Sequence, residues 1–149
     1  MALDLPRSPG TYVLILHLDQ DRDIQVGRLG AFHFPAGFYA YPGSAYGPGG
    51  LRARLTRHVA GGKHRHWHID YLRQVAPVRA LWLAEDQRQE CAWAQALARL
   101  PLAHQPVPGF GASDCRCPSH LFHFPQPPSL ARFRRELDAP GAIQAFILP

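Results

Sequence analysis

The sequence lacks the long apolar runs and the secretory features that mark membrane and exported proteins. Hydrophobic residues make up 46% of its 149 residues. No apolar stretch approaches the roughly 18 residues that a bilayer-crossing helix needs. Residues 1–7 do not lead into an apolar segment with a small-residue cleavage site, so no secretory signal is visible. We therefore expect no membrane partner and a cytoplasmic location.

Acidic residues are scarce, and they are missing altogether from Ile24 through Ile69. Over the whole chain 16 Lys and Arg face 11 Asp and Glu, which gives a formal net charge of +5 with the histidines neutral. The cations of the acid-free stretch are Arg28, Arg52, Arg54, Arg57, Lys63 and Arg65. A local excess of positive charge attracts polyanions, so this stretch predicts a nucleic acid partner. The alternative is a solvated basic face without a ligand.

Cysteine is rare, and its spacing does not suit a disulfide framework. The three cysteines are an odd number, and Cys115 and Cys117 are too close together to form half of a secreted framework. With Cys91 and His120 they offer four side chains of the types that bind zinc. Their spacing lacks the paired CxxC of zinc knuckles. Reduced cysteines packed in a loop of small residues are therefore favoured over a structural zinc ion.

Runs of β-branched and aromatic residues predict a small antiparallel sheet. The expected strands are Thr11–Leu18, Ile24–Leu29, Gly37–Tyr41, Val78–Leu83, a short one near Leu121–Phe124 and an edge strand within Ala142–Leu148. The turn residues Asp19–Asp23 predict a hairpin between the first two strands. Turn-forming residues at Pro42-Gly43-Ser44 and Gly47–Gly50 are expected to follow the third strand.

Apolar periodicity and end signals predict helices around this sheet. Leu51, Leu55 and Val59 form the apolar stripe of a helix that Gly61-Gly62 ends. Three further helices are expected: one over Trp67–Gln74, one over Gln87–Leu100 with Asp86 and Gln89 as a capping box and Pro101 as its stop, and one capped by Ser129 with Leu130, Phe133 and Leu137 on one face. A long loop should span Ala103–Pro128. No repeat or internal boundary is visible, so we expect a single α+β domain over residues 1–149, its sheet flanked by helices.

Three short motifs follow one another along the chain. Gly10-Thr11-Tyr12 opens the first strand, Tyr41-Pro42-Gly43 closes the third, and Leu51-x-x-Arg54-x-x-x-His58 lies on the first helix. In this order they resemble the core of the GIY-YIG nuclease superfamily, in which a later helix also supplies one Glu, matched here by Glu90.

The wider pattern is similar to the Uri-type endonuclease branch of that superfamily. It consists of Tyr41–Ala45, His66–Leu72 and Pro108–Cys115. The resemblance covers the chain from Gly10 to about Phe122. Pro42 replaces the usual branched residue of the second tripeptide. The long stretch between Tyr12 and Tyr41 implies an added strand.

The resemblance implies a catalytic site made of Tyr12, Tyr41, Arg54, His58 and Glu90. Arg54 and His58 stand four residues apart on one helix face and can reach one phosphate together. Glu90 offers a carboxylate suited to Mg²⁺ (or Mn²⁺). Tyr12 would take the proton of an attacking water, and Tyr41 would hold the nucleophile or the phosphate.

Each of these five residues also has an ordinary structural explanation. Tyr12 and Tyr41 are typical core aromatics, Arg54 and His58 are typical solvated helix residues, and Glu90 is a first-turn carboxylate favoured by the helix dipole. Their occurrence together, in this order, favours a nuclease site.

The basic stretch supplies the expected nucleic-acid contacts. These are Arg52, Arg57, Lys63, Arg65, His66, Trp67 and His68, with Trp67 stacking on a base and the cations meeting phosphates. The alternative for His66-Trp67-His68 is a helix start with a buried Trp67. The sequence as a whole predicts a metal-dependent endonuclease acting on DNA, with structured or damaged DNA as one candidate substrate and RNA as an alternative. The competing hypotheses are a non-cleaving nucleic-acid-binding module and a zinc-stabilised interaction domain with a protein partner.

Overall fold

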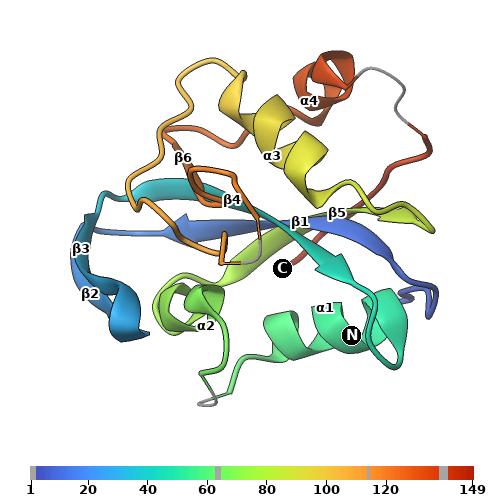
Figure 1. Cartoon of the computed structure of the whole chain (residues 1–149), viewed down its shortest axis with the longest axis horizontal. Helices are drawn as coiled ribbons and strands as arrows, with labels where there is room; N and C mark the ends of the chain where they lie inside the picture. The colour runs from blue at the N-terminus through green and yellow to red at the C-terminus, as the bar shows by residue number, and fades with distance from the viewer. Residues whose placement is uncertain (1–2, 63–64, 114, 138–140) are drawn as a thin grey trace.

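The computed structural model describes residues 3–62, 65–113, 115–137 and 141–149. Its elements are β1 (Gly10–Leu18), β2 (Arg22–Val26), the 3-10 turn η1 (Gly27–Leu29), β3 (Gly30–Phe34), β4 (Gly37–Ala45), α1 (Gly50–Ala60), α2 (His68–Arg73), β5 (Val78–Glu85), α3 (Glu90–Ala98), β6 (Phe122–Phe124), α4 (Leu130–Glu136) and β7 (Gln144–Ile147). Five strands form a sheet in the order β6-β4-β1-β5-β7, with antiparallel pairing throughout the described residues. Figure 1 shows α3 and α4 on one face of this sheet and α1 and α2 on the other. The predicted α+β class is confirmed.

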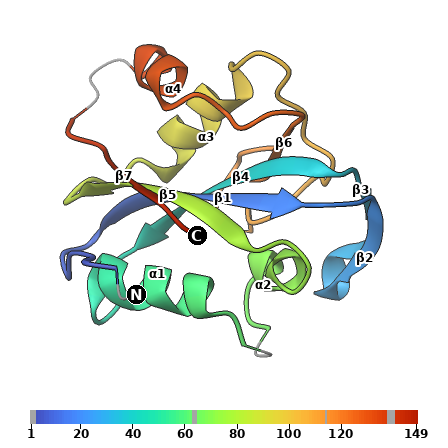
Figure 2. The ribbon, with the colours of Figure 1, turned by 180° about the vertical axis from the view of Figure 1, so that it is seen from behind.

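The central strand, β1, runs between β4 and β5 (Figure 2). Its side chains alternate between two apolar layers, because successive residues of a strand point to opposite faces. Tyr12, Leu14 and Leu16 pack in the buried cluster that includes α1 and α2. Val13 and Ile15 pack in the cluster that includes α3 and α4. A strand buried on both faces must be apolar nearly throughout, which is the composition of Thr11–Leu18.

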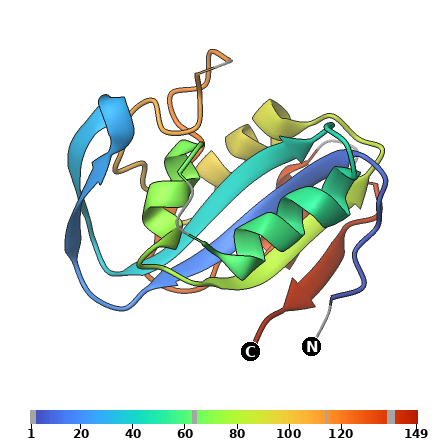
Figure 3. The same ribbon diagram turned by 90° about the horizontal axis from the view of Figure 1, so that it is seen from below.

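The predicted hairpin between Thr11–Leu18 and Ile24–Leu29 is wrong. β1 pairs along its whole length with β4 instead, and β2 pairs with β3 in a separate two-stranded ribbon. Figure 3 shows this ribbon beside α2 at one end of the molecule. β2 is exposed over most of its length, whereas β4 is largely buried, so only β4 suits a place beside β1. The ribbon confirms that the segment between Tyr12 and Tyr41 adds strand structure, although Gly27–Leu29 forms a 3-10 turn.

The predicted turn at Pro42-Gly43-Ser44 is also wrong, because β4 continues to Ala45. Gly43 lies directly opposite Tyr12 in the β1–β4 register, and a Cβ at position 43 would overlap the Tyr12 phenol. The glycine therefore serves close packing within a strand. Pro42 is tolerated because, among the described residues, β6 pairs with β4 only at Phe38–Ala40, which leaves β4 at the sheet edge there.

The start of α3 differs from the prediction, because α3 begins at Glu90 and Asp86 does not cap it. Asp86 lies in a turn with a positive φ of 58°. The buried Thr11 hydroxyl donates to the Gln87 carbonyl at 2.6 Å and accepts from the Gln89 N–H at 2.9 Å. Thr11 thereby holds the connection from β5 in a non-helical path. These two hydrogen bonds therefore keep residues 87–89 out of the helix, so that α3 begins at Glu90.

The buried stripe of α1 differs by one residue from the prediction. Leu51, Leu55 and His58 are buried, while Val59 is 37% exposed. An apolar pattern alone could not select His58, since histidine is usually at least partly solvated. The remaining helices and strands are confirmed, including α2, the Ser129 cap of α4 and β7 at the sheet edge. Within the described ranges, every helix falls short of the length and apolar character that a membrane span requires.

A buried carboxylate of α2 pairs with one arginine of α2 and one of α1. The Asp70 carboxylate, fully buried, accepts from the Arg73 guanidinium at 2.8 Å and from Arg57 at 3.1 Å. It also accepts from the backbone N–H groups of His66 at 2.7 Å and Trp67 at 2.9 Å. Burial by itself would raise the pKa of Asp70, but these hydrogen bonds and the Arg73 charge lower it to about 2.

Asp70→Asn should reduce the free energy of unfolding by about 3–5 kcal/mol, because Arg73 would be left buried without its anion. The depressed pKa means that the stabilisation is complete above the unfolded pKa of Asp, near pH 4, and disappears as pH falls toward 2. Urea unfolding at neutral pH and at low pH measures both effects.

Asp23→Asn is the matched control. Asp23 pairs with His33 at 2.9 Å, but its side chain is 84% exposed, and exposed pairs contribute at most about 1 kcal/mol. Equal losses in the two variants would contradict the assignment of Asp70 as a structural anion.

Candidate functional site

The catalytic residues expected from the sequence line a single cavity of about 280 Å³. Tyr12 comes from β1, Tyr41 from β4, Arg54 and His58 from α1, and Glu90 from α3. Its wall also includes Gly43, Ser44, Trp67 and Gly111. The fold thus brings together side chains that are up to 78 positions apart in the sequence, from Tyr12 to Glu90.

Tyr12 and His58 form the buried centre of the cavity wall. The Tyr12 hydroxyl oxygen and His58 Nε2 lie 3.2 Å apart. Burial raises the pKa of Tyr12 to about 12, although the Arg54 charge acts to lower it. Burial lowers the pKa of His58 to about 3, and the charge of Arg73 adds to this lowering. Near neutral pH the pair is therefore a protonated phenol beside a neutral imidazole.

Arg54 supplies positive charge to the same wall. Its guanidinium donates to the Ser44 carbonyl at 2.8 Å and lies 4.4 Å from the centre of the Trp67 ring. Arg57 lies 4.1 Å from that ring as well. Cation–π contacts of this kind hold a guanidinium in place while its other N–H groups stay available.

Tyr41 forms the wall nearest to the loop that follows α3. Its ring meets Phe110 edge-on at a centroid distance of 5.9 Å. Gly111 has a positive φ of 65°, and a Cβ there would press on the Tyr41 ring. Burial raises the pKa of Tyr41 well above its ordinary value, so this second phenol also carries its proton.

Glu90 reaches the cavity around the edge of the sheet. It is the first residue of α3, on the opposite face from α1, and β6 leaves the end of β4 uncovered there. Its side chain is 30% exposed, and its Oε2 lies 2.9 Å from Nδ1 of the buried His120. The separation suits an ion pair, although the ring N–H is not well aligned with the oxygen for a hydrogen bond.

The expected nucleic-acid contacts divide into two groups. Arg65 and His66 are exposed. The Arg65 guanidinium lies 5.4 Å from the centre of the Tyr71 ring, and the His66 ring lies 4.9 Å from that of Trp67, which lines the cavity. The other described candidates make contacts within the protein. Arg52 donates to the Leu5 carbonyl, and Arg57 pairs with Asp70. Trp67, half-buried at the start of α2, contacts the guanidinium groups of Arg54 and Arg57, and His68 accepts from the Gly111 N–H at 2.8 Å. Lys63 lies outside the described residues.

Four residues near the cavity were not among the expected site residues. Gly43, Ser44 and Gly111 lie within motifs that carry the resemblance, so that pattern could have indicated them. His120 had a signal only as a zinc ligand type. Its contact with Glu90 joins a loop to a helix start across 30 positions, and no local pattern predicts such a pairing.

A group of metal-ligand side chains lies close to this contact. The ligand atoms of Cys91, Cys115, Cys117 and His120 all lie within 4.8 Å of one another. The Cys115 sulfur is 3.3 Å from His120 Nε2. The His120 ring thus contacts Cys115 through Nε2 and Glu90 through Nδ1.

Comparison with models of known protein families assigns the chain to a family. The model described as "Domain of unknown function DUF123" matches residues 11–139. The chain belongs to the DUF123 family. The matched range contains all nine residues of the cavity wall and the four metal-ligand side chains. Comparisons with curated proteins and with solved structures gave no match.

The buried neutral His58 makes the stability of this DUF123 chain depend on pH. Its folded pKa of about 3 lies below the ordinary 6.5, so the unfolded chain binds the proton first as pH falls. Its contribution is therefore complete above pH 6.5 and lost below it. Between pH 7 and pH 5 the free energy of unfolding should fall by about 2 kcal/mol on this account.

His58→Gln should remove most of that pH dependence, as measured by urea unfolding at the two pH values. The control, His33→Gln, changes an exposed imidazole whose pKa is raised by Asp23. The control should retain the loss of stability on acidification. If His58→Gln also retains it in full, the neutral buried state of His58 is excluded.

Proposed function

We propose that this chain is a metal-dependent endonuclease of the GIY-YIG type, related to its Uri-like branch, that hydrolyses phosphodiester bonds in DNA. The observation that best supports the proposal is the shared cavity of Tyr12, Tyr41, Arg54, His58 and Glu90. If each of these five residues had only a packing or helix-end role, nothing would require the five side chains to line the same cavity. The cavity provides a cation, a proton acceptor and a carboxylate, which are the groups that phosphodiester hydrolysis needs.

Arg54 is suited to the charge that develops on the phosphoryl oxygens. Its guanidinium is held by the Ser44 carbonyl and by Trp67. A group fixed in this way before the reaction loses little freedom when it binds phosphate. Tyr41 presents its hydroxyl to the same space, where it can hold the phosphate or the attacking water.

Tyr12 and His58 together are suited to activate the water. A phenol with a pKa of about 12 carries its proton near neutral pH, so Tyr12 can accept a proton only while it passes its own to another group. The neutral His58 Nε2, 3.2 Å away, is in place to receive it. The proton of the water then goes to Tyr12 as the Tyr12 proton goes to His58. The hydroxide attacks phosphorus, the bond from phosphorus to the leaving ester oxygen breaks, and that oxygen takes a proton from solvent water. His58 afterwards returns its proton to solvent.

Glu90 is the residue that would hold Mg²⁺ or Mn²⁺. One hard carboxylate suits a cation that keeps several of its waters, and contact of one carboxylate oxygen with His120 leaves a second oxygen on the same group. When bound, the cation would help neutralise charge on the phosphate and the leaving oxygen. The exposed His66 beside Trp67 and the exposed Arg65 over the Tyr71 ring are the side chains proposed to meet the flanking nucleic acid.

Glu90→Gln should lower Mg²⁺-dependent DNA cleavage by at least about 100-fold, because the metal would lose its carboxylate. The change should cost only about 0.3–1 kcal/mol in unfolding free energy, since the helix start and side-chain shape are retained. Binding to DNA should persist or tighten, because a charge that repels phosphate is removed. Nicking of supercoiled plasmid, DNA affinity and thermal unfolding are measured on one preparation.

Glu136→Gln is the control for this experiment. Glu136 lies on α4 and pairs with Arg99 at 3.2 Å, away from the cavity. The control should cleave at the wild-type rate. Wild-type protein that binds DNA without metal-dependent nicking would favour a non-cleaving module, and Glu90→Gln protein with full activity would exclude Glu90 as the metal ligand.

Tyr12→Phe removes only the hydroxyl of the proposed proton relay. We expect cleavage to fall by about 10²- to 10⁴-fold, with a loss of about 0.5–1.5 kcal/mol in unfolding free energy from the missing hydrogen bond. Tyr71→Phe, on half-buried α2 surface, is the control and should cleave normally. Equal cleavage rates of Tyr12→Phe and wild type over a range of pH would remove Tyr12 from the relay.

A further inference from the structure

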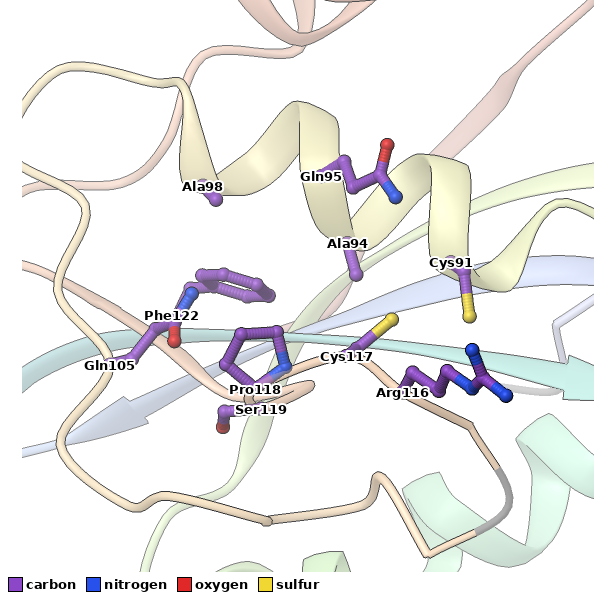
Figure 4. A pocket seen from close by; sticks show the side chains of 10 residues that line it. All are labelled: Cys91, Ala94, Gln95, Ala98, Gln105, Arg116, Cys117, Pro118, Ser119 and Phe122. Carbon is purple, nitrogen blue, oxygen red and sulfur yellow. The ribbon is translucent and has the colours of Figure 1, made fainter.

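A second set of side chains, of the types that bind metal ions, lies next to Glu90. Cys91 is in the first turn of α3, and Cys115, Cys117 and His120 lie in the loop before β6. Figure 4 shows the Cys91 sulfur extending from α3 toward the loop that carries Cys117. Three sulfur atoms and one imidazole nitrogen lie within 4.8 Å of one another. They come from two separate segments, so the clustering is a property of the tertiary fold.

We propose that Cys91, Cys115, Cys117 and His120 form a structural zinc site. In a tetrahedral site with Zn–S near 2.3 Å and Zn–N near 2.0 Å, the ligand atoms lie about 3.5–3.8 Å apart. The 4.8 Å limit is therefore within about 1 Å of the bound geometry. Three thiolates and one imidazole are a common donor set for structural zinc, and soft sulfur ligands disfavour Mg²⁺.

The zinc site would explain how the long loop before β6 keeps a fixed position against α3. Residues 103–113 and 115–121 have little regular structure, yet Val107, Phe110 and His120 are buried. A metal bound by three residues of this loop and one of α3 would tie the loop to the helix. Zinc takes thiolates, so binding would release three thiol protons and leave one net negative charge, which Arg116 between two of the cysteines can offset. The sequence offered these four side chains as possible zinc ligands, but their spacing favoured packed reduced cysteines, because Cys91 lies on a separate helix.

The zinc site would also orient Glu90, a step that rests on the proposed function. His120 Nε2 lies 3.3 Å from the Cys115 sulfur, while its Nδ1 lies 2.9 Å from Glu90 Oε2. A zinc-bound histidine commonly donates its other ring N–H to a carboxylate, which fixes both groups. With zinc on Nε2, Nδ1 would carry the proton 2.9 Å from Glu90 Oε2, and a small rotation of the partly exposed Glu90 carboxylate would bring its oxygen into line with that N–H. His120 is then a positioning residue for the proposed Mg²⁺ ligand.

Metal analysis of the purified wild-type chain tests the zinc site without reference to activity. We expect about one zinc ion per chain after chelator-free purification. Replacement by Co²⁺ should give the visible absorption of a tetrahedral thiolate site. The absence of bound zinc, or a disulfide between any two of the cysteines in the freshly purified protein, would overturn the proposal.

Variants in the loop test which residues bind the metal. Loss of even an outer contact of a metal ligand weakens binding by about 10- to 100-fold, so Cys117→Ser should weaken zinc binding by at least that factor. Ser113→Ala, an exposed position of the same loop, is the matched control and should bind zinc as the wild type does. Equal zinc affinity in Cys117→Ser and Ser113→Ala would overturn the assignment.

The positioning of Glu90 is tested on wild-type protein depleted of zinc and then reloaded. At a temperature where the depleted protein stays folded, we expect the Mg²⁺ concentration needed for half-maximal cleavage to rise by about 10- to 100-fold on depletion and to recover with zinc. An unchanged Mg²⁺ requirement would overturn the positioning role. Full zinc occupancy in a protein that does not cleave would reject the proposed nuclease function and leave the zinc site standing.

Discussion

The structure depends on β1 being buried on both faces and paired on both edges. Its apolar side chains face two separate layers of helices, and β4 and β5 occupy its two edges. The polar residues of β1 must then find partners within the protein. Thr11 binds the connection that starts α3, and Tyr12 finds His58. The strand that builds the core therefore also sets the positions of Glu90 and His58, which are central to the candidate site.

The electrostatics of the cavity follow from this burial. Three guanidinium groups, those of Arg54, Arg57 and Arg73, lower the pKa of His58 in addition to burial. Asp70 pairs with Arg57 and Arg73, so its one negative charge offsets one of their two positive charges behind the cavity. Arg54 is left on the cavity wall as the cation that a phosphate would meet. The result is a neutral imidazole beside a protonated phenol.

The loop between α3 and β6 links the candidate active site to the proposed zinc site. Gly111 packs against Tyr41 at one end, and His120 contacts Glu90 at the other. The same loop carries Cys115 and Cys117. A long segment whose described residues form no strand or helix needs such contacts to keep one conformation, because ordering its backbone costs conformational entropy. Under both proposals, the zinc site would hold the loop that supports one side of the cavity.

The sequence by itself determined the α+β class, the apolar strands and the order of the motifs, because local patterns record which faces are buried and where the chain turns. It did not determine that β1 pairs with β4, that Gly43 lies within a strand, or that His58 is buried in place of Val59. Those features depend on burial against residues far along the chain. Only the tertiary structure decided the contact of His120 with Glu90 and the meeting of Cys91 with Cys115 and Cys117. Side chains at the start of α3 and in the distant loop become neighbours only when the core packs around β1. The number of residues between them in the sequence does not reveal how close they lie in space.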